Sequence, residues 1–269
     1  MILLLSNFHT HTIFCDGKST PEEVVRSAIE KGFHAIGFSG HGFTDFDATY
    51  CMKDTDEYIR QLMDLRERYK KDIEVYIGVE EDAGHLVDRS KFDYILGSSH
   101  YFYVNGQYYS VDHSPETFQK CLEVFHYDVP AMAENYYGSF CKYIMERKPD
   151  IVGHFDLITK FDELGESRFL NNPVYHKIVE GYMAEVAKSG CIFEVNTGAI
   201  CRGMRTTVYP SENLLYILKK NGAKLILSSD SHVASTLDFY FDETKAYLRD
   251  MGFTELYTMH RGKFVPYSI

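Results

Sequence analysis

The sequence has a deficit of positive charge. Among its 269 residues, 28 are Lys or Arg and 39 are Asp or Glu, which gives a formal net charge of −11. Because the phosphate backbone of a nucleic acid is held by Lys and Arg side chains, we expect no nucleic-acid partner. A small anion held in one local pocket is still compatible with this composition.

Cysteine motifs and long apolar runs are lacking as well. The six cysteines form no CxxC pair and no short disulfide spacing, so we expect reduced thiols in a cytoplasmic protein. No apolar run approaches the ~20 residues of a membrane span, and the opening MILLLS lacks the basic leader and the length of a signal peptide. These absences predict a protein located in the cytoplasm, without a membrane partner.

The sequence also has no low-complexity segment, linker or short repeat. Hydrophobic residues make up 45% of it and charged residues 25%, which is typical of a globular protein with a large core. A chain of 269 residues is long for one domain, but α/β barrels commonly reach this size. We therefore expect a single domain over residues 1–269.

Short apolar segments alternate with segments of helical periodicity. The helix after the first strand is the clearest, because Thr20 can serve as N-cap, Pro21 as first residue and Glu23 as partner in a capping box, with Gly32 as the stop. We predict strands at 2–11, 34–41, 73–80, 94–100, 150–156, 191–198 and 224–232. We predict further helices at 55–70, 115–126, 130–147, 173–189, 211–222 and 243–251.

This alternation favours a parallel sheet whose strands are joined by helical crossovers. Such a sheet is either open and doubly wound or closed into a barrel. Chemically reactive residue types stand at the carboxyl ends of almost all the predicted strands, and a closed barrel brings those ends together at one mouth. We therefore expect an α/β fold of the barrel type.

Metal-ligand residue types supply most of these strand ends. His9 and His11 form an HxH pair on the first strand, and Asp230 and His232 repeat that spacing on the last. Residues two apart on a strand point to the same face, so each pair can hold one ion. The strands between them end in four more candidates, which are His41, Glu80, His100 and His154.

Each residue has a plainer interpretation when it is taken alone. A single His at a strand end is more often a hydrogen-bonded structural residue than a ligand, and one HxH pair is a weak signal. The joint pattern favours a metal site. We expect surface or packing roles for the other histidines, at 34, 85, 113, 126, 176 and 260. The tyrosines at 101, 103, 108 and 109 either line a pocket or belong to a loop packed on the barrel.

The ligand set indicates the chemistry. Six His with Glu80, Asp230 and Asp16 give nine ligands, too many for one ion with about four and enough for two or three divalent Zn, Mn or Fe ions. Such a cationic pocket suits a dianion such as a phosphate monoester, which a metal-bridged hydroxide attacks at phosphorus. Glu80 is the natural bridging carboxylate, and Glu81 competes for that role because only the strand register separates the two.

Six motifs in order resemble those of the polymerase and histidinol phosphatase (PHP) family: HTHTIFCDG, SGH, GVE, SSH, GHFD and SSDSH. The resemblance covers nearly the whole chain and implies a distorted (βα)7 TIM-like barrel with two or three metal ions at its mouth. It also implies three ligand sets, which are His9, His11, Glu80 and Asp230; Glu80, His100 and His154; and Asp16, His41 and His232. Among these ligands we expect Asp16, Glu80, Asp230 and His232 to be catalytic.

Within the family, the chain is most similar to the single-domain histidinol-phosphate phosphatases. The supporting stretches are GHFDLITKF and EVNTGAICRG, which place Lys160 and Arg202 just past two strands as the residues that meet the phosphate. The resemblance thus implies hydrolysis of L-histidinol phosphate, a small-molecule substrate, as a step of histidine biosynthesis. Family members often carry Arg near the position of Lys160. The sequence does not predict an oligomeric state.

Three other functions stay open on the sequence. A phosphoesterase of the same family could act on nucleotides or DNA ends, although the acidic charge and the lack of an appended domain speak against it. An amidohydrolase also opens with HxH, but that group usually bridges its metals with a lysine, where Glu80 stands here. The third is a metal-binding protein without catalytic activity.

Overall fold

The structure is a computed structural model, and it describes residues 4–269. Its main sheet has nine strands in the order β1-β2-β3-β4-β7-β8-β9-β10-β11. The predicted parallel sheet is confirmed, since neighbours from β1 to β10 pair in parallel and only β11 is antiparallel. The strands are β1 (Ser6–Asn7), β2 (Ala35–Phe38), β3 (Glu74–Asp82), β4 (Tyr94–Ser98), β7 (Ile151–Val152), β8 (Ile192–Asn196), β9 (Lys224–Ser228), β10 (Glu255–His260) and β11 (Lys263–Ser268).

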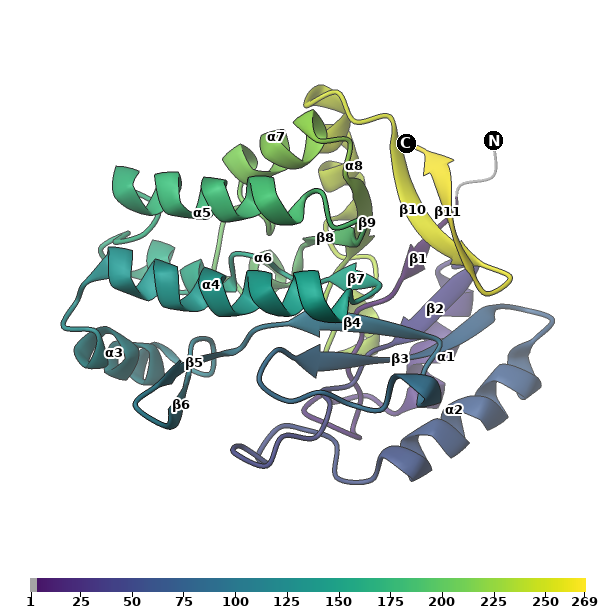
Figure 1. The fold of residues 1–269 in the computed structure, drawn as a ribbon. Coiled ribbons are helices and arrows are strands. Elements are labelled where there is room, and N and C mark those ends of the chain that lie inside the picture. Colours follow the sequence, from purple (N-terminus) through teal and green to yellow (C-terminus); the bar gives the residue numbers. More distant parts are fainter. Residues whose placement is uncertain (1–3) are drawn as a thin grey trace.

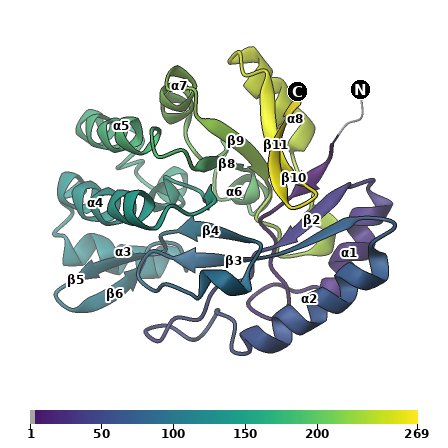
Figure 2. The same cartoon turned by 45° about the vertical axis from the view of Figure 1, so that its right-hand side comes forward.

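Helices cover the outer side of this curled sheet (Figures 1 and 2). Helices α1 and α2 lie together on one side, and α4 and α5 lie side by side on the opposite side. The helices are α1 (Pro21–Glu30), α2 (Thr55–Tyr69), α3 (Pro115–Val124), α4 (Val129–Arg147), α5 (Pro173–Val186), α6 (Gly198–Cys201), α7 (Glu212–Lys220) and α8 (Phe241–Asp250). Among residues 4–269, none of these helices combines the length and apolar character that a membrane span requires.

The sheet curls until the segments that follow β1 and β9 meet. Thr10 and Ser231 form a parallel bridge, in which the His11 N–H donates to the Ser231 carbonyl (2.8 Å) and the Ser231 N–H donates to the His9 carbonyl (3.1 Å). In the middle of β9, Ile226 pairs with Tyr257 of β10. The regular strand–helix alternation is interrupted between β3 and β4, which are joined by the single 3₁₀ turn η1 (Arg89–Lys91).

The inside of the curl is filled by a small apolar cluster. Tyr94 lies at its centre, and its hydroxyl donates to the carbonyls of Phe8 (2.8 Å) and Phe38 (3.0 Å). Two glycines make room for this ring, because a Cβ on Gly78 would lie 2.3 Å from it and a Cβ on Gly37 would lie 2.6 Å from its hydroxyl. The cluster is Phe8, Ala35, Tyr76, Tyr94, Leu96, Ile151, Ile192, Ile226 and Met259. It forms a floor beneath the carboxyl ends of the strands.

Two β-hairpins were absent from the sequence prediction. Strands β5 (Tyr101–Val104) and β6 (Gln107–Ser110) pair in the Tyr-rich segment, and β10 and β11 pair at the C-terminus. Two predicted strands are much shorter than expected. Strand β1 covers two residues of the predicted 2–11, of which residues 2 and 3 lie outside the described part, and β7 covers two residues of 150–156. Helix α5 ends at Val186, before the predicted 189.

Candidate metal centre

Strand pleating determines which side chains face the interior of the curl. On β3, Tyr76 belongs to the inner apolar cluster, whereas Ile77 and Val79 belong to an outer one. Since successive residues alternate, Glu80 faces inward. Glu81 faces outward, where it accepts hydrogen bonds from the Tyr143 hydroxyl (2.7 Å) and Arg147 Nη2 (2.7 Å).

The same alternation on the other strands raises polar residues above the apolar floor. Leu96 is followed on its face by Ser98 and His100, and Ile226 is followed by Ser228 and Asp230. The inner face of each strand therefore changes from apolar to ligand-type at about the same height, and the polar end is the carboxyl end. This is the edge at which α/β barrels place their active sites.

The first predicted ligand set lies close together. His9 Nε2 lies 3.3 Å from Glu80 Oε2 and 3.5 Å from Asp230 Oδ1. His11 Nε2 lies 3.5 Å and 3.2 Å from the same two oxygens. Both histidines and Glu80 are fully or almost fully buried. The bridge between Thr10 and Ser231 holds the segment after β1 beside the segment after β9, and so brings His9 and His11 close to Asp230.

The second and third predicted sets are adjacent to the first. Glu80 Oε1 lies 3.0 Å from His154 Nε2 and 3.2 Å from His100 Nε2. At the mouth, Asp16 lies 3.6 Å from His41 Nε2 and 3.3 Å from His232 Nε2. Glu80 touches the first two sets, and its Oε2 also lies 3.0 Å from His41 Nδ1.

Several of the candidate ligand atoms are placed to bind a metal ion rather than to hydrogen-bond with one another. His9 Nε2, His11 Nε2 and Glu80 Oε2 are buried, yet have no hydrogen-bond partner among residues 4–269. Buried polar atoms rarely lack a partner, and a bound ion is one explanation. Four overlapping groups each bring ligand atoms within 4.8 Å of one another: His11, Asp16, His41 and His232; His9, His11 and Glu80; His9, His154 and Asp230; and His41, Glu80 and His100.

Burial and neighbouring charges set the protonation of the cluster. Burial, together with the nearby imidazoles of His232 and His41, lowers the pKa of His11 to about 3. Burial would raise the pKa of Glu80, but the surrounding imidazoles, His9 first, hold it well below its usual value. Burial would lower the pKa values of His9, His41 and His100, but nearby carboxylates raise them. Metal ligands must be neutral imidazoles and ionised carboxylates, so binding of an ion would release protons from these histidines.

Two carboxylates that were not predicted from the sequence contact the Nδ1 atoms of candidate histidine ligands, on the side of the ring away from the cluster. Glu194 on β8 accepts from His9 Nδ1 at 2.6 Å, and Asp82 on β3 lies 3.1 Å from His100 Nδ1. Each lies on the inner face, two residues from Ile192 and Glu80 respectively. For Glu194 the available signal was an acidic residue inside an otherwise apolar strand, whereas Asp82 directly follows two other acidic residues at the end of β3.

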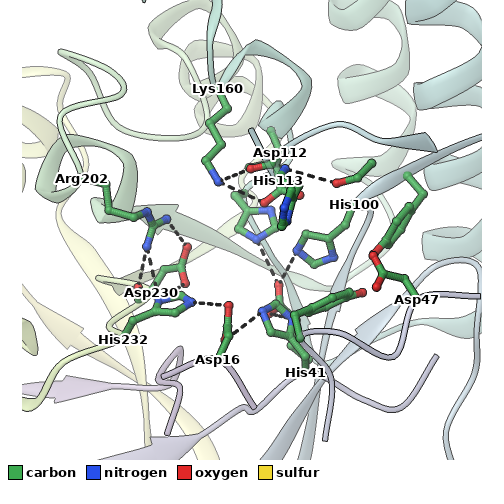
Figure 3. Close-up of a pocket in the computed structure, with 16 residues that line it drawn as sticks. Asp16, His41, Asp47, His100, Asp112, His113, Lys160, Arg202, Asp230 and His232 are labelled. Carbon is green, nitrogen blue, oxygen red and sulfur yellow. Dashed lines mark hydrogen bonds and ion pairs between the residues drawn. The ribbon is translucent and has the colours of Figure 1, made fainter. Parts of the chain in front are cut away.

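The two predicted phosphate-binding cations lie on the rim of one pocket, where Figure 3 shows them pointing toward acidic partners. Lys160 Nζ donates to the Asp112 carbonyl (2.8 Å) and lies 3.1 Å from its carboxylate. Arg202 Nη2 donates to Asp230 Oδ2 at 2.7 Å, and Nη1 donates to the Asp230 carbonyl at 3.0 Å. The structure thus brings both cations to the candidate site.

The outer wall of this pocket comes largely from segments to which the sequence assigned no site. Its residues are Asp47, Tyr50, Tyr101, Ser110, Asp112, His113 and Leu157. His113, for which we expected a surface or packing role, is exposed and also lines this pocket, because the β5–β6 hairpin returns the chain from Tyr101 to Ser110 at its mouth. Of the four tyrosines left open, Tyr101 lines the pocket and donates to Asp47 Oδ2 at 2.9 Å.

Known proteins resemble this chain over nearly its full length. The "Probable histidinol-phosphatase" of Schizosaccharomyces pombe is 28% identical, with 94% of this chain and 89% of that protein covered. The histidinol-phosphatase of Lactococcus lactis is 23% identical, with 94% and 93% covered. A crystal structure of the Lactococcus lactis histidinol phosphate phosphatase, complexed with zinc, L-histidinol and phosphate, superimposes with a TM-score of 0.69 at 19% identity, covering 97% of this chain and 98% of that one.

The family assignment rests on a separate match. Residues 7–198, from the end of β1 to the start of α6, match the PHP domain family. This range includes seven of the nine candidate ligands, and the remaining two, Asp230 and His232, lie within 4 Å of them. The chain belongs to the PHP domain family.

Proposed function

We propose that this chain is a metal-dependent phosphomonoesterase that hydrolyses L-histidinol phosphate to L-histidinol and phosphate. The observation that carries the proposal is the clustering of nine ligand-type side chains, seven of which line one pocket together with two cations. The names of the similar proteins from Schizosaccharomyces pombe and Lactococcus lactis support the same activity. We further propose a single-domain, distorted (βα)7 barrel, in the cytoplasm, with no nucleic-acid or membrane partner.

The residues would hold two or three divalent ions, of Zn, Mn or Fe. One set is His9, His11, Glu80 and Asp230, a second is Glu80, His100 and His154, and a third is Asp16, His41 and His232. Imidazole and carboxylate donors without thiolate suit these metals. Glu80 belongs to two sets, so its charge would be shared by the two ions that they hold. Bound ions would supply a nucleophile at neutral pH and offset charge on the phosphoryl group.

Lys160 and Arg202 would bind the phosphate. Both line the pocket beside the candidate metal ligands. The planar guanidinium of Arg202 can meet two phosphate oxygens at once, whereas the ammonium of Lys160 acts as a point charge. Each cation is held by an acidic neighbour, Asp230 or Asp112, which fixes its position before substrate arrives.

The acidic outer wall suits the alcohol end of this substrate. Histidinol carries an ammonium group and an imidazole, and the wall contains Asp47 and Asp112 together with Tyr50 and Tyr101. Burial would raise the pKa of Asp112, but Lys160 and the nearby imidazoles of His100 and His154 together lower that pKa to about 2. The wall is therefore anionic at neutral pH, which favours a cationic alcohol over a nucleotide or a DNA end.

A panel of phosphomonoesters tests the proposal. Phosphate release by the zinc- or manganese-loaded protein would be measured with L-histidinol phosphate, serine phosphate, a nucleoside monophosphate and a 3′-phosphorylated oligonucleotide. We expect kcat/KM to be highest for histidinol phosphate by at least roughly 10²-fold, about 2.7 kcal/mol of transition-state discrimination. Preference for either nucleotide substrate would contradict the assignment and would favour a nucleotide or DNA-end phosphoesterase.

A further inference from the structure

Glu194 connects three segments of the centre without being a candidate ligand itself. It lies on β8 and is 1% exposed. Its Oε1 lies 2.6 Å from His9 Nδ1. Its Oε2 accepts from the His154 main-chain N–H at 2.8 Å and from Asn196 Nδ2 at 2.9 Å. One buried carboxylate thus contacts the ends of β1 and β7 as well as its own strand.

These contacts determine which nitrogen of His9 can serve as a ligand. An imidazole that donates from Nδ1 to a carboxylate keeps its lone pair on Nε2. In His9 that atom faces the cluster, 3.3 Å from Glu80 Oε2 and 3.5 Å from Asp230 Oδ1. It is also one of the buried atoms without a hydrogen-bond partner among residues 4–269.

We infer that Glu194 is a positioning residue for the metal centre, which fixes the tautomer and orientation of His9 and holds the backbone at His154. The inference rests on the proposed metal-dependent function and adds a residue to it. Acidic partners of this kind behind a ligating histidine raise its basicity, and their loss commonly lowers metal affinity about 10- to 100-fold.

A purely structural role explains the arrangement less well. Burying a carboxylate is costly, and a buried ion pair is often no more stable than apolar side chains of similar size. The neighbours on the outer face of β8, Phe193 and Val195, fill the core without polar groups. Asp82 repeats the arrangement on β3, because its Oδ2 accepts from the His100 main-chain N–H at 2.9 Å and lies 3.1 Å from His100 Nδ1.

Glu194→Gln is the sharpest test, because it preserves size and removes one acceptor. Glu194 accepts on both oxygens, so in either amide orientation the new NH₂ group faces a donor, at His9 or at His154. We expect zinc affinity, measured by competition with a chelator, to fall about 10- to 100-fold. Glu185→Gln, on the exposed side of α5, is the matched control and should bind zinc like the wild type.

A second measurement separates positioning from folding. In zinc-loaded, ¹⁵N-histidine-labelled protein, long-range ¹H–¹⁵N spectra should show His9 protonated at Nδ1 in the wild type and in Glu185→Gln. In Glu194→Gln this pattern should be lost, while the melting temperature of the metal-free protein stays close to that of Glu185→Gln. If Glu194→Gln does not fold, Glu194→Asp keeps the charge, shortens the reach, and should show the same loss of affinity.

Two outcomes would overturn the inference and are distinguishable. If the wild type binds zinc and hydrolyses histidinol phosphate, but Glu194→Gln keeps its affinity and its Nδ1 proton, the inference alone fails. If the wild type binds no metal ion, the proposed function fails and the inference with it.

Discussion

Glu80 and Glu81 are adjacent in the chain and have opposite environments. Glu80 lies among imidazoles in the candidate metal centre, and Glu81 lies against Arg147 and Tyr143 behind the sheet. The strand pleat alone makes this difference. The sequence left the two alternatives open, because both residues end the same apolar run and neither reveals which face the strand turns inward.

Exchanging each glutamate for glutamine should separate the two roles. Glu80→Gln should lower kcat/KM by roughly 10³-fold or more, at least about 4 kcal/mol, because it removes a charge shared by two cations. Glu81→Gln should keep near-normal kcat/KM but lose on the order of 1–3 kcal/mol of stability, since it weakens charge-assisted hydrogen bonds. Steady-state kinetics and thermal unfolding of both variants check this. The reverse result would mean that β3 is one residue out of register.

The two rim cations allow a prediction about substrate binding. Lys160→Ala and Arg202→Ala should each lower kcat/KM for histidinol phosphate about 10- to 100-fold, ~1.4–3 kcal/mol, because each removes a charge from the phosphate. The loss for Lys160→Ala should be similar or somewhat smaller. Metal content, measured by elemental analysis, should stay unchanged for Lys160→Ala, whose side chain contacts Asp112 rather than a candidate ligand. Near-normal kinetics in either variant would remove that residue from phosphate recognition.

The sequence predicted the convergence of all nine ligand candidates but not their supporting residues. Ligand types stood out because they follow apolar runs, where imidazoles and carboxylates are otherwise uncommon. Glu194 lies inside such a run, and its contacts with His9 and His154 depend on three strands meeting. Asp112 and His113 reach the pocket only because the β5–β6 hairpin returns the chain to its mouth. Such contacts between distant segments leave no local pattern.

Among the elements, helix α1 matches its sequence signals most closely. Thr20 caps it, and Glu23 completes the predicted capping box through bonds in both directions. The helix also contacts the segment after β9, where Ser27 Oγ donates to the Ala234 carbonyl at 2.7 Å. Capping is local chemistry between residues three apart, so a single sequence suffices to predict it.

Thr20→Ala should therefore weaken the fold without touching the chemistry. We expect a loss of about 1 kcal/mol, which for a chain of this size lowers Tm by roughly 2–4 °C. Thr20→Ser, which retains the capping oxygen, is the control and should unfold near the wild-type temperature. Differential scanning calorimetry of metal-loaded protein measures the shift. An unchanged Tm would indicate that contacts of α1 with the sheet outweigh its cap.

The two hairpins that were not predicted differ in how clearly their turn residues mark them in the sequence. The turn of β5–β6 is Asn105–Gly106, with φ of 51° and 81°, and this dipeptide is the commonest signature of a two-residue hairpin. Arg261 and Gly262 make the corresponding turn between β10 and β11, with φ of 50° and 74°. The second signal is weaker, since Arg rarely takes positive φ, and β10 is further stabilised by pairing with β9.

For the whole molecule, metal ions and fold should be coupled. The candidate ligands come from β3 and from the segments after β1, β2, β4, β7 and β9, so a bound ion connects strands that are distant in sequence. Without ions, several buried donors and acceptors have no partner among residues 4–269. An ion that binds only the folded state stabilises it by mass action.

Chelation tests this coupling. Prolonged dialysis against a chelator should abolish phosphatase activity and lower Tm, and Zn, Mn or Fe should restore both. Elemental analysis of the active protein should give two to three equivalents of metal, as the nine ligand candidates imply at about four per ion. One equivalent or less in fully active protein would contradict a multinuclear centre, and activity after complete metal removal would point to another mechanism.

The bridge between Thr10 and Ser231 also has a consequence for protein synthesis. The candidate ligands extend from His9 to His232, so a nascent chain carries its first imidazoles long before the last ones are translated. Metal capture by the full set must therefore wait until residue 232 has left the ribosome. A product cut short after β8 would keep His9, His11 and Glu80 but lack the strand that closes the ring around them.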